Sequence, residues 1–308
     1  MYAYQNPLDD LKRFFSRKSL LASLIYINLG VFLLVNVSKV IFWLFQVSNP
    51  GAAGGDVSWV TWYLSVPANL SDLASRPWTL ITYMFLHENF LHLLFNMIVL
   101  YFGGRIFLEY LDNRKLLSVY ILGGLAGAFF YIGAFNFFPV FESSLGQSIA
   151  LGASASVLAV LIAVATYVPE YSIVLFLFGR LKLKYLALIT ILVDVLSIPW
   201  GNAGGHIAHL GGAFWGFLYI FALKKGSDLT ISFRWLNFKR HKGFNRKSGR
   251  YEQPKRGRPL SDDEYNARRR ENQAKIDQIL EKIARSGYGS LSSEEKALLF
   301  QSSNKNRN

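Results

Sequence analysis

Long apolar runs alternate with short polar connections along most of this 308-residue chain. Several runs approach or exceed the roughly 20 residues that cross a bilayer as a helix. We predict six membrane-spanning helices, of which the fifth is the shortest: about 19–38 with an extension to 45 left open, 84–108, 116–136, 150–168, 185–200 and 205–223. The pattern therefore predicts an all-α, polytopic membrane protein. Small residues recur at helix-packing spacing, which favours a tight bundle over a wide channel.

The composition agrees with a membrane protein. Hydrophobic residues make up 52% of the chain and charged residues only 17%, whereas soluble domains carry about 25% charge. The absence of cysteine excludes disulfides, thiol nucleophiles and thiolate metal sites. The first apolar run follows a polar segment and lacks a convincing cleavage site, so we expect no secretory signal. Asp9 and Asp10 argue against an organelle presequence.

Positive charge is concentrated in particular connections. The net charge is +13, and residues 224–308 contribute +11 of it, from 21 Lys and Arg less 10 Asp and Glu. Basic residues also precede the first run and lie between the second and third and between the fourth and fifth. The alternate connections contain only Arg76. By the positive-inside rule both termini are cytoplasmic, and we expect a multi-pass protein of the bacterial cytoplasmic (inner) membrane.

Four segments follow from these patterns. Residues 1–18 form a cytoplasmic N-terminal segment, 19–224 the six-helix domain, 225–260 a basic flexible linker and 261–308 a cytoplasmic helical hairpin. Capping boxes at Ser261–Glu264 and Ser292–Glu295 predict the starts of the two hairpin helices. We expect the basic tail to bind anionic membrane lipid. No nucleic-acid partner is expected, and the sequence specifies neither the hairpin's role nor the oligomeric state.

Polar side chains inside the apolar runs are the candidates for chemistry, because such groups are costly in hydrocarbon. Four of the five histidines lie in or beside predicted spans: His87, His92, His206 and His209. A serine follows Gly152-Ala153 at the start of the fourth run. A serine and imidazoles together provide a nucleophile and a base for acyl transfer.

Helical spacing favours one serine and one histidine. Ser154 and Ser156 point to nearly opposite faces of a helix. Ser156 belongs to a stripe of small residues that explains it by packing, so Ser154 is the better nucleophile candidate. His209 shares the close-packing face of its helix with Gly212, whereas His206 either orders the mouth of the site or lies at the outer interface.

A third run supplies further polar groups. His92 and Asn96 are four residues apart and share one helix face, and both side chains are suitable donors to an oxyanion. Asp194 is the only carboxylate well inside a span. We favour a structural role for Asp194 over a catalytic one, and a Ser–His dyad is chemically sufficient without it.

The chain resembles the rhomboid family of intramembrane serine proteases over about residues 19–224, in its bacterial six-helix form with a C-terminal extension. Three motifs carry the resemblance, in order along the second, fourth and sixth runs: His87-(x4)-His92-(x3)-Asn96, Gly152-Ala153-Ser154, and Ala208-His209-Leu210-Gly211-Gly212-(x3)-Gly216. The resemblance implies a six-helix fold with a cavity open to the outer side.

The resemblance also implies roles for individual residues. Ser154 would be the nucleophile and His209 the general base, while His92, Asn96 and the Ser154 backbone N–H would form the oxyanion hole. The substrates would be single-span membrane proteins cut near helix-destabilising residues, with no cofactor and no metal ion. Three positions depart from the common family pattern: Ala155, Leu158 and Thr79.

Two hypotheses of function are consistent with these residues. The first is an intramembrane serine endopeptidase that uses the dyad and the His/Asn oxyanion hole. The second is a catalytically silent rhomboid-like protein that binds client transmembrane helices. The second needs no nucleophile, and it would leave the presence of Ser154, His209, His92 and Asn96 unexplained.

Overall fold

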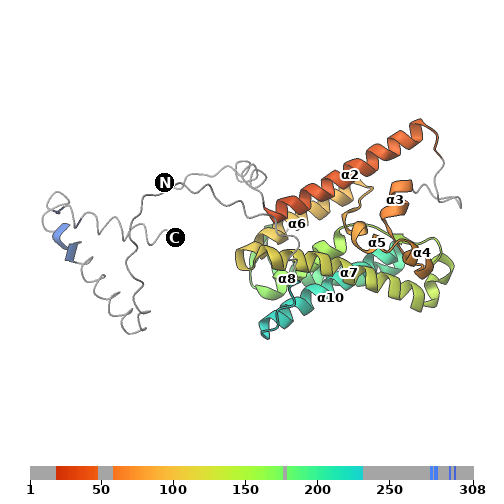
Figure 1. The fold of residues 1–308 in the computed structure, drawn as a ribbon. Helices are drawn as coiled ribbons and strands as arrows, with labels where there is room; N and C mark the ends of the chain where they lie inside the picture. The colour runs from red at the N-terminus through yellow and green to blue at the C-terminus, as the bar shows by residue number, and fades with distance from the viewer. Residues whose placement is uncertain are drawn as a thin grey trace. The chain divides into compact units, whose positions relative to one another are not determined.

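The protein is described by a computed structural model that covers residues 19–47, 58–175 and 179–231, together with a few positions near the C-terminus: 278–279, 281–283, 291–292 and 295 (Figure 1). The chain divides into two compact units, residues 1–238 and 239–308. The predicted segment 1–18, most of the linker 225–260 and the capping box Ser261–Glu264 lie outside the described residues.

Five helices in the described residues are long and apolar enough to span a membrane. They are α2 (Leu20–Leu44), α6 (Phe90–Tyr110), α7 (Asn113–Phe137), α9 (Leu183–Ser197, continued by the 3-10 helix η3, Ile198–Trp200) and α10 (Ala203–Lys224). The all-α polytopic prediction is confirmed, and the first span does extend to residue 44. The fourth predicted span, 150–168, is instead the shorter helix α8 (Ser154–Tyr167) of 14 residues.

Helix α8 is the centre of the bundle. Eleven of its fourteen residues are buried, and it contacts α6, α7, α9 and α10. It begins at Ser154 because Gly152 has a φ of +130°, which helices do not adopt. It ends at Tyr167 because Pro169 disfavours helical backbone at the residue before it. The short length of α8 therefore places Ser154 inside the bundle.

Short elements fill the connections. The segment before α6 contains α3 (Trp59–Leu64), β1 (Val66–Pro67), α4 (Leu70–Ser75), α5 (Thr79–Thr82) and the 3-10 helix η1 (Tyr83–Phe85). Between α7 and α8 lie the 3-10 helix η2 (Pro139–Ser144) and β2 (Ile149–Ala150), and between α8 and α9 lie β3 (Ser172–Leu175) and β4 (Gly179–Lys182).

These connections are tied to the bundle by two small ladders. Strand β1 pairs antiparallel with β2, with Val66 opposite Ala150, and β3 pairs antiparallel with β4. The β1–β2 ladder fixes the chain just before Ser154 against the segment that follows α3. It therefore helps to set where α8 can begin.

Small residues allow α8 to approach its neighbours closely. A Cβ added to Gly212 of α10 would lie 2.1 Å from the carbonyl oxygen of Ala155, and one added to Gly216 would lie 2.2 Å from that of Ala159. A Cβ on Gly123 of α7 would meet the Ala159 methyl at 2.2 Å. The predicted tight packing is therefore present along α8 on both sides.

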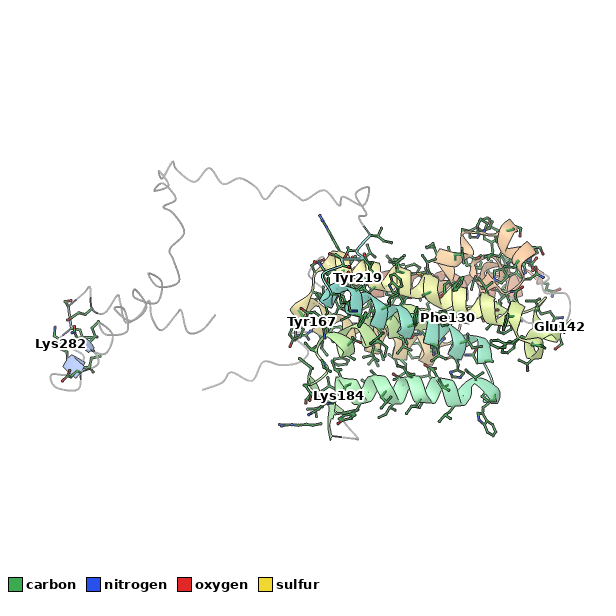
Figure 2. The ribbon with its side chains drawn as sticks, turned by 90° about the horizontal axis from the view of Figure 1, so that it is seen from below. Phe130, Glu142, Tyr167, Lys184, Tyr219 and Lys282 are labelled. Carbon is green, nitrogen blue, oxygen red and sulfur yellow. The ribbon has the colours of Figure 1, made fainter. Side chains whose placement is uncertain are left out.

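The two ends of the bundle differ in charge. Figure 2 places Tyr167, Lys184 and Tyr219 at one end and Glu142 at the other. At the first end, Lys224 Nζ donates to the Thr166 carbonyl at 2.8 Å, and Lys182 and Lys184 both pair with Glu170. Basic side chains therefore collect where α8 and α10 end and α9 begins.

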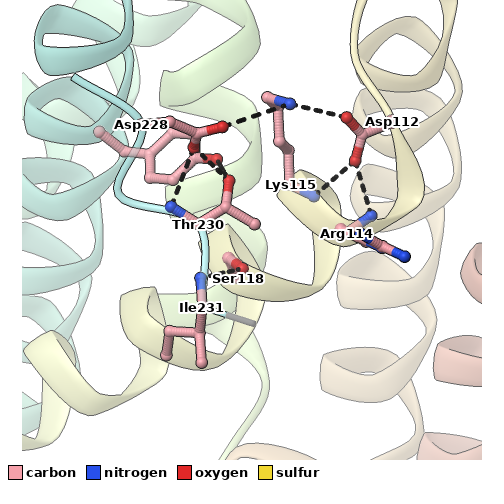
Figure 3. A network of polar contacts seen from close by, with 8 residues as sticks. Asp112, Arg114, Lys115, Ser118, Asp228, Thr230 and Ile231 are labelled. Carbon is pink, nitrogen blue, oxygen red and sulfur yellow. Dashed lines mark hydrogen bonds and ion pairs between the residues drawn. The ribbon is translucent and has the colours of Figure 1, made fainter. Parts of the chain in front are cut away.

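The start of the predicted flexible linker is held against α7. The Ile231 backbone N–H donates to Ser118 Oγ at 3.1 Å, and Tyr219 Oη lies 2.6 Å from Thr230 Oγ1. Asp228 lies 3.6 Å from Lys115 Nζ (Figure 3). Residues 227–231 are thus ordered by polar contacts that the composition of this segment does not reveal.

Asp112 caps helix α7 and anchors the same network. Its Oδ1 accepts from the backbone N–H groups of Arg114 and Lys115 at 2.9 and 3.0 Å, and Lys115 Nζ donates to Oδ2 at 2.7 Å. Burial by itself would raise the pKa of Asp112, but the hydrogen bonds from Lys115 and Arg114 outweigh it and lower this pKa. The stabilisation by Asp112 is therefore present at neutral pH and is lost as the pH falls below about 3.9.

We expect Asp112→Ala to lower the free energy of unfolding by about 0.5–2 kcal/mol, because the N-cap is lost. Asp112→Asn keeps a capping oxygen and loses only an exposed ion pair, which contributes about 0–1 kcal/mol. Thermal unfolding midpoints in one detergent measure both. Equal midpoints for the alanine variant and the wild-type protein would contradict the capping role.

In the C-terminal unit the described residues include the second predicted capping box. Glu295 N–H donates to Ser292 Oγ at 3.2 Å, and Ser292 N–H donates to Glu295 Oε2 at 2.7 Å. Lys282 Nζ also contacts Glu295 at 2.9 Å. The reciprocal bonding predicted for Ser292–Glu295 is therefore confirmed.

Candidate functional site

A cavity of about 850 Å³ opens at the end of the bundle where α8 and α10 begin. Ser154, His92 and His209 all line it, and they come from α8, α6 and α10 respectively. Segment 140–151 and η3 form further parts of its wall. The cavity thus lies away from the basic end of the bundle, and it brings together three of the four predicted site residues.

Ser154 is the first residue of α8. The helix N-terminus has no side-chain cap, and the first N–H groups of any helix lack intrahelical acceptors. A serine at this position presents its hydroxyl beside backbone donors that can hold developing negative charge. Ser156, by contrast, is fully buried and its Oγ has no hydrogen-bond partner among the described residues.

Gly152 allows His92 to lie beside Ser154. A methyl group on Gly152 would be 2.9 Å from His92 Cε1, 3.4 Å from His92 Nε2 and 3.5 Å from Ser154 Oγ. Only glycine combines this close approach with a φ of +130°. The Gly152 backbone N–H donates to the Tyr83 carbonyl at 2.9 Å, which holds the turn in place.

Asn96 lies behind the cavity wall. It is buried and is absent from the lining, which includes His92 one turn earlier. Asn96 Nδ2 donates to His87 Nε2 at 3.0 Å, and the His87 and His92 rings are in edge contact with centroids 5.2 Å apart. His87 therefore links the two predicted oxyanion donors.

The imidazoles of His206 and His209 converge on one carboxylate. Nδ1 of each ring lies 2.8 Å from Oδ1 of Asp194 on α9. Since the carboxylate can only accept, both Nδ1 atoms carry the proton, and Nε2 of each neutral ring is an acceptor. His209 lines the cavity, whereas His206 does not. His209 is therefore the one of the two that shares the cavity with Ser154.

Within the described residues no hydrogen bond joins Ser154 Oγ to His209, although both side chains line the same cavity. Catalytic hydrogen bonds are often long in ligand-free enzymes and tighten when substrate binds.

Asp and His side chains also bind divalent cations in proteins, and the possible ligand atoms of Asp194, His206 and His209 lie within 4.8 Å of one another. The two N–H···O hydrogen bonds to Asp194 are enough to explain why these three side chains converge.

The comparisons with known proteins agree with this geometry. The sequence model of the rhomboid domain family matches residues 74–226, which include the cavity residues from all three helices. The chain belongs to the rhomboid family. A second model, for a family of unknown function named DUF6576, matches residues 261–305.

Curated rhomboid relatives come from animals, plants and fungi. Presenilin-associated rhomboid-like protein A, mitochondrial, from Danio rerio is 30% identical, over 52% of this chain and 40% of its own length. RHOMBOID-like protein 12, mitochondrial, from Arabidopsis thaliana is 32% identical, over 46% and 44%. Rhomboid protein 1, mitochondrial, from Saccharomyces cerevisiae is 27% identical, over 51% and 45%. The chain spans less than half the length of these relatives.

The expected location in the bacterial cytoplasmic membrane is wrong, because these relatives are mitochondrial proteins. The distribution of Lys and Arg predicts only which side of the membrane the termini face, and the bacterial membrane is expected from the resemblance to the bacterial six-helix form. That distribution orients helices relative to a membrane, and it carries no information on which membrane holds them. The multi-pass part of the prediction agrees with the five candidate spans.

The three departures from the family pattern occupy packed positions. Ala155 is buried with its carbonyl facing Gly212. Leu158 packs with Leu161, Ile162 and Ala213, and Thr79 Oγ1 donates to the Arg76 carbonyl at 2.6 Å. Ala155 also lines the cavity, whereas Leu158 and Thr79 do not. The rhomboid cavity therefore keeps its polar groups despite these substitutions.

Proposed function

We propose that this rhomboid protein is an intramembrane serine endopeptidase, with Ser154 as nucleophile and His209 as general base. The observation that carries the proposal is the shared cavity. Ser154 stands there at an uncapped helix N-terminus, opposite a histidine whose Nδ1 is held by a carboxylate. A free Nε2 facing the same space as a serine hydroxyl is the arrangement that nucleophilic catalysis requires.

The reaction follows from these two groups. Ser154 Oγ forms a bond to the scissile carbonyl carbon as its proton passes to His209 Nε2, and the carbonyl oxygen becomes an oxyanion. The C–N bond then breaks, and His209 gives the proton to the leaving amine. Water next attacks the acyl-enzyme and gives a proton to His209. The C–Oγ bond breaks, and the proton returns to Ser154.

His92 and the first N–H groups of α8 are the proposed oxyanion donors. His92 lies against Gly152 beside the serine, and the helix N-terminus contributes its partial positive charge. Asn96 is proposed to act from behind His92. Its amide donates to His87, whose ring in turn contacts that of His92.

Single-span membrane proteins are the proposed substrates. Helix α9 buries only Leu183 and Asp194, and η3, which continues it, forms part of the cavity wall, so α9 is the span that a substrate can displace most easily. The backbone of an intact helix is shielded, and cleavage requires local unwinding. Glycine or proline near the cleaved bond lowers the cost of unwinding by about 1 or 3 kcal/mol respectively.

A cleavage assay in proteoliposomes tests the proposal. Purified protein is co-reconstituted with a single-span substrate that carries a Gly-Pro pair near one end of its span, and products are identified by mass spectrometry. We expect cleavage next to that pair and loss of cleavage when the pair is changed to Ala-Ala. A protein that binds the substrate helix and releases no fragment would support the silent rhomboid-like binder instead.

We propose anionic lipid as a second partner, attracted by the basic residues between 225 and 260. Co-sedimentation of that segment with vesicles of phosphatidylcholine alone, or with added phosphatidylglycerol, tests this attraction. Binding that requires phosphatidylglycerol and weakens with salt is expected. Equal binding to both vesicles would contradict it.

Removal of the His92 side chain should slow catalysis while leaving the protein folded. We expect His92→Ala to lower kcat about 10²–10³-fold, the usual cost of one oxyanion donor, with a smaller change in KM. Leu91→Ala is the control, because Leu91 is adjacent on α6 and exposed. A kcat for His92→Ala equal to that of Leu91→Ala would exclude His92 from the oxyanion hole.

A further inference from the structure

Asp194 has no counterpart in a Ser–His dyad, and it occupies an unusual position. It is one of only two buried residues on α9, while its neighbours Val193 and Val195 are exposed apolar side chains. A carboxylate within an apolar span is expensive and usually marks a function. The burial of Asp194 is therefore compensated by specific partners and is not a consequence of general packing.

Those partners are the two imidazoles of α10. His206 and His209 are three residues apart and so lie on the same helix face, and each donates Nδ1–H to Asp194 Oδ1 at 2.8 Å. The side chains of the histidines remain 21% and 24% exposed, against 9% for Asp194. The carboxylate thus lies at the buried side of the cluster, and the rings extend from it toward more open space.

This geometry has a direct effect on His209. A hydrogen bond from Nδ1–H fixes the neutral ring in the tautomer whose Nε2 is unprotonated, and it fixes the ring orientation. The carboxylate also stabilises the imidazolium that forms when Nε2 takes the serine proton. Throughout the reaction Nδ1 keeps its proton, so Asp194 is not itself protonated.

We infer that Asp194 is a positioning residue for His209, which extends the proposed dyad to a Ser154–His209–Asp194 triad whose carboxylate comes from a separate membrane-spanning helix. The inference rests on the proposed function, since positioning a base matters only if Ser154 is a nucleophile. It assigns to α9, a span with only two buried residues, a part in the catalytic geometry. Displacement of α9 would then also release His209.

Asp194→Asn separates positioning from simple tethering of α9 to α10. Asparagine has the same size and keeps one acceptor oxygen, so a tether survives, whereas the negative charge is lost. In trypsin the equivalent substitution lowers kcat about 10⁴-fold. We expect a fall in kcat of about tenfold or more here, with KM changed by less than about threefold. Asp72→Asn is the matched control, because Asp72 on α4 undergoes the same chemical change outside the cavity lining.

The outcomes are distinguishable from failure of the proposed function. If wild-type protein cleaves the reconstituted substrate and Asp194→Asn has a kcat within about tenfold of wild type, the positioning role is excluded and the protease remains. A rise in KM that accounts for the whole loss would likewise reduce Asp194 to a tether. If wild-type protein itself cleaves nothing, the proposed function fails.

A second measurement is made on the wild-type protein and uses a variant only to assign the signals. Nitrogen-15 chemical shifts of the His209 ring, assigned with a His206→Gln sample, report which nitrogen carries the proton. We expect protonated Nδ1 and unprotonated Nε2 in the wild-type protein at neutral pH. Protonation at Nε2 would overturn the inference directly.

Discussion

Replacing Ser154 by alanine is expected to abolish proteolysis while the protein remains folded. The substitution removes only the hydroxyl at the start of α8, where no capping bond depends on it. Loss of the nucleophile in a serine protease of another fold lowers kcat by roughly 10⁶, so turnover of a reconstituted substrate should fall to background. The measurement is fragment release per enzyme over several hours in proteoliposomes.

Ser156→Ala is the matched control for this experiment. Ser156 lies two residues further along the same helix and is fully buried, and its Oγ makes no hydrogen bond among the described residues. Its replacement therefore removes no polar contact, and we expect cleavage close to that of wild type. Activity that persists in Ser154→Ala and disappears in Ser156→Ala would reverse the assignment of the nucleophile.

Among replacements of a single glycine of the bundle by alanine, Gly212→Ala should lower the free energy of unfolding most. The added Cβ would lie 2.1 Å from the Ala155 carbonyl oxygen and 3.0 Å from its Cα. These are backbone atoms of a central helix that is enclosed by four others, so α8 and α10 must separate. Overpacking usually costs about 1–3 kcal/mol, and we expect this site to reach or exceed the upper end.

The same substitution should also reduce activity. Ala155 follows Ser154 directly, and α10 carries His209, so separation of the two helices moves the nucleophile away from the base. Gly133→Ala on α7 is the control, because nothing lies within 4 Å of the Cβ that it adds, and alanine favours a helix by up to about 1 kcal/mol. An unfolding midpoint for Gly212→Ala equal to that of Gly133→Ala would contradict the close packing of α8 on α10.

Hydropathy was sufficient to predict most of the fold. Spans such as 116–136 and 205–223 correspond closely to α7 and α10, because a continuous apolar run is a strong signal. The apolar run predicts a longer helix than α8, because residues 150–153 are apolar or small, yet Ala150 belongs to β2 and residues 151–153 are not helical. That conformation depends on the β1–β2 ladder and on the φ of Gly152, and hydropathy does not report either.

The candidate site was predicted in part. Helical spacing and the order of motifs selected Ser154, His209 and His92, and the structure places all three on one cavity. The sequence favours a structural role for Asp194, because its distance to a histidine on another helix cannot be obtained from spacing alone. Two signals pointed to it: a lone carboxylate within an apolar run, and two histidines three residues apart on the next helix.

Mass spectrometry after labelling with a fluorophosphonate tests most directly whether Ser154 is activated by His209 in a shared cavity. The probe is incubated with intact, membrane-reconstituted protein, and the modified residue is mapped on the digested chain. We predict a single phosphonylated serine at position 154, with labelling lost in His209→Ala. An unlabelled folded protein, or a label on another serine, would contradict the account.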